Sequence, residues 1–213
     1  GTIAAWLARV PRRYVLITGL GFAFTAGRRG LVSAIVRSMY RMALNQATKV
    51  FFQNPDDERL FREIGLLAPS VPSVVVNGSG VDVAEYSLNP FPSSGVSFLM
   101  IGRLLGDKGV REYAQAARRV LALHPEVQFR LVGWIDSNPD AISQSELDEW
   151  LSDGTLEFLG KLDDVRPAIA ESTIYVLPSY REGTPRTVLE AMAMGRPIIT
   201  TDAPGCRETV VDG

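Results

Sequence analysis

Short apolar runs rich in β-branched residues alternate with amphipathic helical stretches along most of the chain. Such alternation is typical of a parallel sheet with helices on both faces, so it predicts an α/β fold with Rossmann-like units. The strands are expected at residues 14–18, 49–53, 73–78, 96–101, 127–133, 155–160, 174–179 and 197–200. The helices are expected at residues 30–47, 55–65, 109–123, 143–151, 164–171 and 185–194.

The alternation is interrupted once, by residues 77–95, which are crowded with Gly, Pro, Ser and Asn. This composition is typical of a linker. A chain of 213 residues is long enough for two small domains. We therefore expect one domain at 1–85 and a second at 86–213.

The charge of the chain is unevenly distributed. Residues 1–50 contain eight Arg or Lys and no Asp or Glu, whereas the whole chain has a net charge of −2. A basic segment beside an apolar helical stripe (Leu31, Ile35, Met39 and Met42) could rest on an anionic membrane surface. The alternative, a solvated basic helix face, stays open. A nucleic-acid partner is not expected, because no zinc-finger, basic-zipper or RNA-binding pattern accompanies the charge.

Several classes of protein are disfavoured by composition. The single cysteine, Cys206, allows no internal disulfide and indicates a reducing compartment. No apolar run is long enough for a transmembrane helix, and the first residues do not resemble a signal peptide. The single histidine, His124, rules out a His-based catalytic pair. A cytoplasmic location is expected, with peripheral attachment to the inner membrane face as the variant that residues 1–50 suggest.

Two glutamates, Glu182 and Glu190, stand eight positions apart around the start of the helix expected at 185–194. Thr184 is expected to cap this helix, with Pro185 at its first position. The amides of Gly183, Thr184 and the first turn then form an anion site. A nucleotide sugar fits this layout: sugar at Glu182, diphosphate at the amides, ribose at Glu190. The alternative is a pair of exposed acids that flank a helix.

The loop "GRLLGDKG" at 102–109 favours the nucleotide sugar. Arg103 and Lys108 follow the first strand of the same sheet, and Gly102 lets a ligand approach the backbone closely. Arginine and lysine bind phosphate oxygens. The two loops together place cations near a helix N-terminus at the carboxyl edge of one sheet.

These stretches carry a family resemblance. "GRLLGDKGVREYAQAARRV", "VQFRLVG", "LEFLG" and "IYVLPSYREGTPRTVLEAMAMGRPIITTDAPGCRETV" resemble retaining glycosyltransferases of family 4, which have the GT-B fold. "NGSGVD" at 77–82 resembles the turn where such enzymes cross between domains. "LITGLGFAF" and "VFFQNPDDERLF" resemble a bacterial subgroup that transfers sugars, often N-acetylated hexosamines, onto lipid-linked acceptors for surface glycans.

The resemblance implies roles for particular residues. Arg103 and Lys108 would bind the donor diphosphate, Glu182 the hydroxyls of the transferred sugar and Glu190 those of the ribose. The other donor-site residues that it implies are the amides of Gly183, Thr184 and Arg186, the base neighbours Gly160 and Lys161, and the cleft-wall residues Gly133 and Trp134. No Asp-x-Asp occurs in the chain, so donor binding is expected to need no metal or other cofactor. The resemblance also implies that the anomeric configuration of the sugar is retained through front-face attack by the acceptor.

The resemblance is incomplete at both ends. Residues 1–85 look like the later part of the acceptor domain, and residues 86–213 like a donor domain without its last helices, so we expect a fragment with weak or no turnover. UDP is the expected nucleotide, and a polyprenyl-linked or polysaccharide acceptor is expected. Three alternatives stay open: a GDP-mannose donor with a soluble oligosaccharide acceptor, an inactive nucleotide-sugar-binding scaffold, and another GT-B enzyme such as an epimerase or a phosphorylase.

Overall fold

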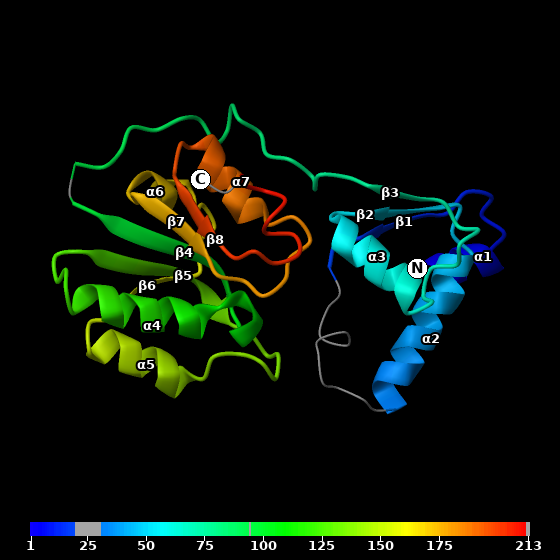
Figure 1. The fold of residues 1–213 in the computed structure, drawn as a ribbon, viewed down its shortest axis with the longest axis horizontal. Coiled ribbons are helices and arrows are strands. Elements are labelled where there is room, and N and C mark those ends of the chain that lie inside the picture. The colour runs from blue at the N-terminus through cyan, green and yellow to red at the C-terminus, as the bar shows by residue number, and fades with distance from the viewer. Residues whose placement is uncertain (20–30, 94, 212–213) are drawn as a thin grey trace. The chain divides into compact units, whose positions relative to one another are not determined.

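The computed structural model describes residues 1–19, 31–93 and 95–211, with side chains of the second range from residue 34 on (Figure 1). The chain forms two compact units: Gly1–Gly78 with Glu182–Thr184, and Ser79–Arg181 with Pro185–Gly213. The division after Gly78 lies inside the expected linker and seven residues before the expected boundary at 85. The glycine-rich stretch around 20–27 and the stripe residue Leu31 lie outside the described side chains.

The first unit contains a three-stranded parallel sheet in the order β1-β2-β3. Val50 and Phe52 of β2 point to one face, where they pack with Leu44 and Phe61 from two helices. The rings of Phe52 and Phe61 meet edge to face at 5.3 Å. The elements are α1 (Thr2–Leu7), β1 (Tyr14–Ile17), α2 (Leu31–Asn45), β2 (Lys49–Phe52), α3 (Pro55–Glu63) and β3 (Ser73–Val75).

The boundaries of α3 follow local sequence chemistry. The Asn54 side chain accepts a hydrogen bond from the amide of Asp57 at 2.8 Å, and Pro55 occupies the first turn. Gly65 follows the helix with a φ of +68°, a conformation that glycine adopts without strain. A helix was expected at 55–65, but its cap, Asn54, was not predicted. No helix was expected at α1, and the third strand ends at Val75 rather than at residue 78. Beyond Val75, the Val76 amide still donates to the Phe52 carbonyl of β2 at 2.8 Å.

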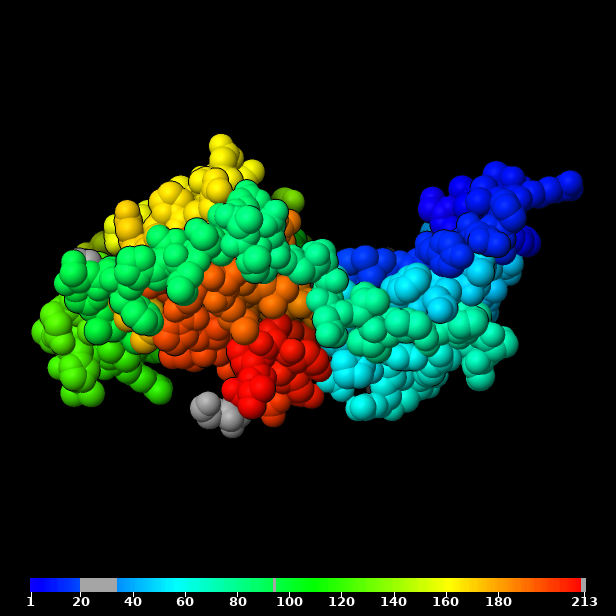
Figure 2. All heavy atoms as spheres, turned by 90° about the horizontal axis from the view of Figure 1, so that it is seen from above, coloured from blue at the N-terminus to red at the C-terminus, as the bar shows by residue number. Residues whose placement is uncertain are grey.

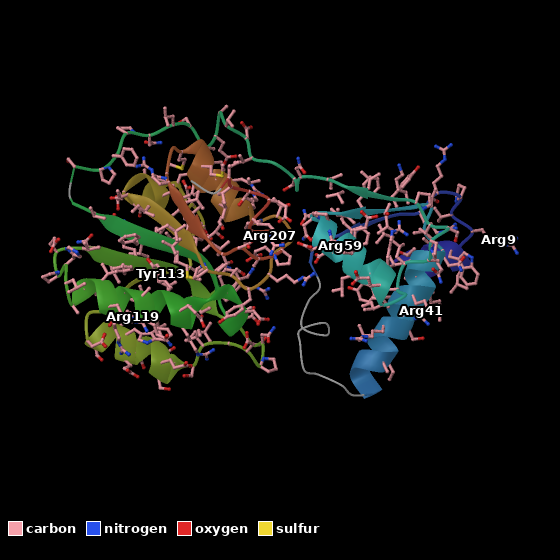
Figure 3. All side chains as sticks on the ribbon, viewed as in Figure 1. Arg9, Arg41, Arg59, Tyr113, Arg119 and Arg207 are labelled. Carbon is pink, nitrogen blue, oxygen red and sulfur yellow. The ribbon has the colours of Figure 1, made fainter. Side chains whose placement is uncertain are left out.

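The basic residues among the first fifty differ in their surroundings within the first unit. Arg41 donates to the carbonyl of Gly65 at 2.8 Å, whereas Arg9 is exposed after α1 (Figure 3). The stripe residues Ile35, Met39 and Met42 are all about half exposed on α2. Among the described residues, no helix is both long and apolar enough to cross a bilayer.

The second unit contains a five-stranded parallel sheet in the order β6-β5-β4-β7-β8. Numbered within the unit, this is 3-2-1-4-5, the strand order of a Rossmann-like sheet, as predicted. Its strands are β4 (Ser97–Leu104), β5 (Gln128–Ile135), β6 (Glu157–Gly160), β7 (Ile174–Leu177) and β8 (Ile198–Thr200). Its helices are η2 (Gly106–Lys108), α4 (Val110–Leu121), α5 (Gln144–Ser152), α6 (Arg166–Ala170) and α7 (Arg186–Ala193).

Side chains of β4 alternate between two cores, one on each face of this sheet. Met100 and Leu104 pack with Tyr113 and Trp150 beneath α4 and α5. Leu99 and Ile101 pack with residues of α6 and α7 on the opposite face (Figure 1). The predicted arrangement, a parallel sheet covered by helices on both faces, is therefore confirmed for this unit.

Candidate functional site

The strand order of the second unit creates a topological switch point between β4 and β7. These neighbouring strands are followed by α4 and α7, which cover opposite faces of the sheet. The loops after the two strands therefore start at the same carboxyl edge and lead to opposite faces, and ligands bind at such an edge in sheets of this kind. The loop after β4 contains Lys108, and the loop after β7 leads through Glu182 to α7.

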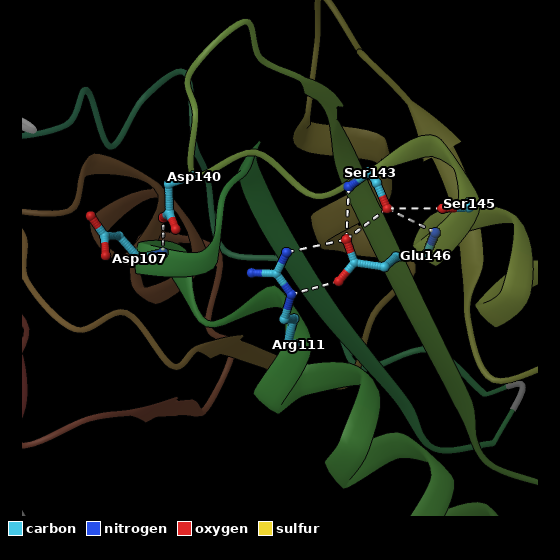
Figure 4. A network of polar contacts seen from close by, with 6 residues as sticks. All are labelled: Asp107, Arg111, Asp140, Ser143, Ser145 and Glu146. Atoms are coloured by element: carbon cyan, nitrogen blue, oxygen red, sulfur yellow. Dashed lines mark hydrogen bonds and ion pairs between the residues drawn. The ribbon is translucent and has the colours of Figure 1, made fainter.

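The turn that carries Lys108 is fixed by Asp140. The amide of Gly106 donates to the Asp140 carbonyl at 2.9 Å, and the amide of Asp107 donates to its carboxylate at 2.7 Å (Figure 4). A Cβ on Gly106 would lie 2.8 Å from this carboxylate and from the Arg111 guanidinium. A side chain at this position would therefore displace the Asp140 carboxylate or the Arg111 guanidinium.

The two loops are also bonded to each other. The Asp107 carbonyl accepts hydrogen bonds from the Tyr180 amide at 3.0 Å and from the Ser179 hydroxyl at 3.1 Å. Gly109 has a φ of +77°, and a Cβ there would lie only 2.1 Å from the carbonyl oxygen of Pro178. Backbone contacts thus hold the beginning of the second loop against the turn that carries Lys108.

Carboxylates around this turn have altered pKa values. Burial, together with the nearby Asp140 carboxylate, raises the pKa of Asp107, and Lys108 partly opposes this rise. Behind the turn, Arg111 donates to both oxygens of Glu146 at 2.6 and 3.1 Å (Figure 4). These bonds and the amide of Ser143 lower the pKa of Glu146 to about 2. The pair ties α4 to α5, and Glu146 also forms a capping box with Ser143 at the start of α5.

The two predicted phosphate-binding cations differ in their surroundings. Arg103 is near the end of β4, half exposed, and its guanidinium lies 3.2 Å from the Asp136 carboxylate. Lys108 ends the short helix η2 and is partly buried. No described atom lies within 4 Å of the position that a Cβ on Gly102 would take, so the backbone beside Arg103 is open on that side.

The start of α7 corrects one prediction. The residue that caps this helix is Pro185, with an extended ψ of 105°, and not Thr184. The helix begins one residue later than predicted because Pro185 keeps this extended conformation and Arg186 is the first helical residue. No side chain caps this end. The first-turn amides of α7 are therefore not satisfied by a capping side chain, which is the condition for an anion site.

Glu190 is on the second turn of α7 and is only 5% exposed. Its carboxylate lies 2.9 Å from the Arg186 guanidinium and accepts a hydrogen bond from the Tyr86 hydroxyl. Burial and the Glu190 carboxylate raise the pKa of Tyr86, so this hydroxyl remains a donor at neutral pH. By contrast, Glu182, Gly183 and Thr184 group with the first unit, and we place them only by their position in the chain, between β7 and α7.

A hollow of about 320 Å³ brings together four predicted residues, Gly133, Trp134, Gly160 and Lys161. The Lys161 ammonium lies 5.2 Å from the centre of the half-exposed Trp134 ring. Gly133 also has a packing reason, since a Cβ there would lie 1.9 Å from the Gly102 carbonyl oxygen in the paired strand. The hollow has five further lining residues that sequence reasoning missed: Ile135, Gln144, Leu147, Leu151 and Phe158.

A larger hollow, of about 550 Å³, lies at the other end of α7 and is lined partly by Arg196 and Glu208. It includes no residue with a predicted role. We rank the smaller hollow first as a candidate ligand site, because it continues from the carboxyl edge of β5, where ligands bind in such sheets. Across the described parts of the chain, no three His, Cys, Asp or Glu residues cluster closely enough to hold a metal ion.

Three residues near the predicted site were also missed: Tyr86, Asp136 and Asp140. Each contacts its partner through a hydrogen bond or an ion pair that spans more than thirty residues of sequence. No local spacing pattern signals such contacts.

Comparisons with known proteins point to one family. A profile of the family described as glycosyl transferases group 1 matches residues 95–213. The chain is 32% identical to the N,N'-diacetylbacillosaminyl-diphospho-undecaprenol alpha-1,3-N-acetylgalactosaminyltransferase of Campylobacter jejuni, over 99% of this chain and 57% of that protein. It is 30% identical to the UDP-Gal:alpha-D-GlcNAc-diphosphoundecaprenol alpha-1,3-galactosyltransferase of Escherichia coli, over 96% of this chain and 55% of that protein.

The chain therefore spans about half the length of these relatives. Among solved structures, that of Anabaena HepE in complex with UDP and glucose superposes with a TM-score of 0.72 at 20% identity, covering 100% of this chain and 58% of that one. This likeness confirms the GT-B fold class that the sequence predicted. The match to the profile covers more than half of the chain, which accordingly belongs to the glycosyl transferases group 1 family.

Proposed function

We propose that this chain is the donor-binding part, with a portion of the acceptor domain, of a retaining glycosyltransferase of family 4. It would transfer a hexose or an N-acetylhexosamine from a nucleoside-diphosphate sugar to a lipid-linked or polysaccharide acceptor. The observation that carries this proposal is the switch point of the second unit. There, a turn bearing Lys108 is bonded to the loop that leads to the uncapped start of α7.

The chemistry of glycosyl transfer explains this arrangement. Breaking the anomeric bond builds negative charge on the departing diphosphate, and preorganised positive groups stabilise that charge most effectively. Lys108 and the first-turn amides of α7 supply such groups without a metal ion. Arg103 can join them by exchanging Asp136 for a phosphate, because a half-exposed ion pair is weak. Glu182 would hold the transferred sugar during front-face attack.

The hollow beside Trp134 suits the nucleoside base. Trp134 and Phe158 supply apolar surface, and Lys161 supplies a hydrogen-bond donor at the rim. UDP is our preferred donor nucleotide, because UDP occurs in the name of the Escherichia coli relative and in the HepE complex. The ribose would then extend from this hollow toward Glu190.

The acceptor is inferred from the relatives. Both are named for sugars linked to undecaprenol through a diphosphate, so we propose a polyprenyl-linked acceptor at the cytoplasmic membrane face. Residues 1–85 would belong to the acceptor domain and residues 86–213 to the donor domain. The exposed Arg9 and the half-exposed side chains of α2 would rest on anionic lipid.

Calorimetric titration tests the donor site. The chain is titrated with UDP, UDP-GlcNAc, UDP-GalNAc and GDP-mannose, and each titration is repeated on Lys108→Ala. We expect saturable binding of one nucleotide family, weakened at least about tenfold, or roughly 1.4 kcal/mol, by the substitution. Arg118→Ala is the matched control, since Arg118 forms ion pairs with Glu149 and Asp153 away from the switch point. A folded sample that binds none of the four ligands would refute the proposal.

A further inference from the structure

The linker of the second unit is bound along α7. The amide of Asn89 donates to the Met194 carbonyl at 3.3 Å. Arg196 donates to the carbonyls of Asn89 and Pro90 at 2.8 Å each, and its guanidinium lies 5.0 Å from the centre of the Phe91 ring. Figure 2 shows this segment as a green band over the orange residues. The linker is therefore fixed in place at the C-terminal end of the helix.

At the other end of this bound segment, Tyr86 reaches the second turn of the same helix. Tyr86 is only 9% exposed and packs in the apolar core beneath α6 and α7. Its hydroxyl is hydrogen-bonded to Glu190. A buried ring with a hydroxyl on a carboxylate has little freedom to move, so the linker presents a fixed hydrogen-bond donor to Glu190.

The two partners of Glu190 differ in how easily a ligand can replace them. Arg186 is 61% exposed and one turn away on the helix surface. Such exposed pairs contribute little to stability, so solvent or a ligand can displace this guanidinium at low cost. Tyr86 packs in the apolar core, so moving its hydroxyl away from the carboxylate would require the ring to leave that core. A ligand that approaches Glu190 would therefore exchange with Arg186 and not with Tyr86.

We propose that Tyr86 is a positioning residue for ribose recognition: its hydroxyl holds the Glu190 carboxylate so that its remaining acceptor sites face the two ribose hydroxyls of the donor nucleotide. This inference rests on the proposed function. A carboxylate can accept several hydrogen bonds, and fixing its plane beforehand removes the entropic cost of orienting it when the ligand binds. The effect of Tyr86 should therefore appear only with nucleotides that carry ribose hydroxyls.

Binding of a matched pair of nucleotides tests this prediction. Whichever of UDP and GDP binds the full chain more tightly is compared with its 2′,3′-dideoxy analogue, on the wild type, Tyr86→Phe and Tyr113→Phe. The wild type should prefer the ribose form at least about tenfold, as expected for hydrogen bonds to a charged group. Tyr86→Phe should reduce this preference to below about threefold, and affinity for the dideoxy analogue should stay unchanged.

Tyr113→Phe is the control for a lost buried hydroxyl. Tyr113 lies between α4 and the sheet, where its hydroxyl donates to the Arg130 carbonyl at 3.1 Å (Figure 3). This variant should unfold at a lower urea concentration and keep the full ribose preference. If Tyr86→Phe kept that preference, or weakened the binding of both nucleotides equally, Tyr86 would have only a structural role. This inference would then fail while the proposed function still held. If the folded wild type bound neither UDP nor GDP, the proposed function would fail, and this inference with it.

Discussion

Glu190 and Arg196 are both almost completely buried beside α7, at 5% and 3% exposure, yet their charges are accommodated differently. Glu190 has a guanidinium and a hydroxyl as partners. Arg196 contacts two carbonyls and a ring, and its Nε and Nη1 atoms have no hydrogen-bond partner among the described residues. Both residues contact the linker, so the comparison concerns one helix and one segment.

The difference fits the binding role that we propose for Glu190 and a structural role for Arg196. A buried charge without an opposite charge is costly, and burial lowers the pKa of Arg196 accordingly. That cost is compatible with a structural task, because the same guanidinium donates to two carbonyls of the linker. Glu190 is charge-balanced, and its carboxylate retains acceptor sites for a ligand. The difference agrees with the recognition role that we propose for Glu190, whereas Arg196 attaches the linker.

Nucleotide affinity should show the largest difference between the two residues. Glu190→Ala removes the acceptors for ribose, so affinity should fall between about tenfold and a hundredfold, or roughly 1.4 to 3 kcal/mol. Arg196→Met keeps an unbranched side chain at the C-terminal end of α7, away from the proposed ribose position, and should change affinity less than about twofold. Calorimetric titration of both variants measures the contrast. Equal losses would mean that the linker clamp, and not the carboxylate, controls binding.

The free energy of unfolding should show the opposite order, with Arg196 as the residue that matters more. Arg196→Ala removes two hydrogen bonds from a charged donor and leaves a cavity, so the free energy of unfolding should fall by about 2 kcal/mol. Arg196→Met fills most of that space and removes the buried charge, so its change should stay below about 1 kcal/mol. Urea unfolding of both variants gives the two values. A Met variant as unstable as the Ala variant would show that the guanidinium itself, with its carbonyl bonds, dominates.

Helices and strands could be predicted from the sequence where the residues that define them are close together in the chain. The order of strands and helices follows from hydrophobic periodicity, and Asn54, Gly65 and the Ser143–Glu146 capping box set helix ends through contacts within a few residues. The start of α7 was misplaced because Thr184 and Pro185 both fit the first positions of a helix, and local chemistry does not decide between them.

The candidate site was predictable only in part. The roles of the cations and the glutamates stay predictions from the loops that carry them, whereas the hydrogen bond to Glu190 comes from Tyr86, which is 104 positions away in the sequence. Arg196 gave no signal for the same reason, because its partners are backbone carbonyls of the linker. Hydrogen bonds to backbone carbonyls leave no pattern of residue types, so only the folded chain reveals them.

A third charged group, the Glu146 carboxylate paired with Arg111, extends the comparison to a partly exposed pair. The folded-state pKa of Glu146, about 2, lies below its ordinary value of 4.5. The ionised Glu146 carboxylate therefore stabilises the folded state. This contribution is fully present above pH 4.5 and is lost as the pH falls through about 2. Arg111 and Glu146 are each about one-third exposed, so solvent screening limits the effect to about 1 kcal/mol, the smallest of the three.

Glu146→Gln isolates this contribution, because glutamine at the third helical position can still complete the capping box with Ser143. Urea unfolding at pH 6 and pH 3 should show a smaller loss of stability on acidification in the variant than in the wild type. Arg118→Gln serves as the control for an exposed pair and should leave the pH dependence nearly as it is in the wild type. If the Glu146→Gln variant lost as much stability between pH 6 and pH 3 as the wild type does, the ion pair would contribute nothing measurable to stability. Partial burial would then not be enough to make an ion pair stabilising in this protein, and Glu190, which is more deeply buried, would be the informative case.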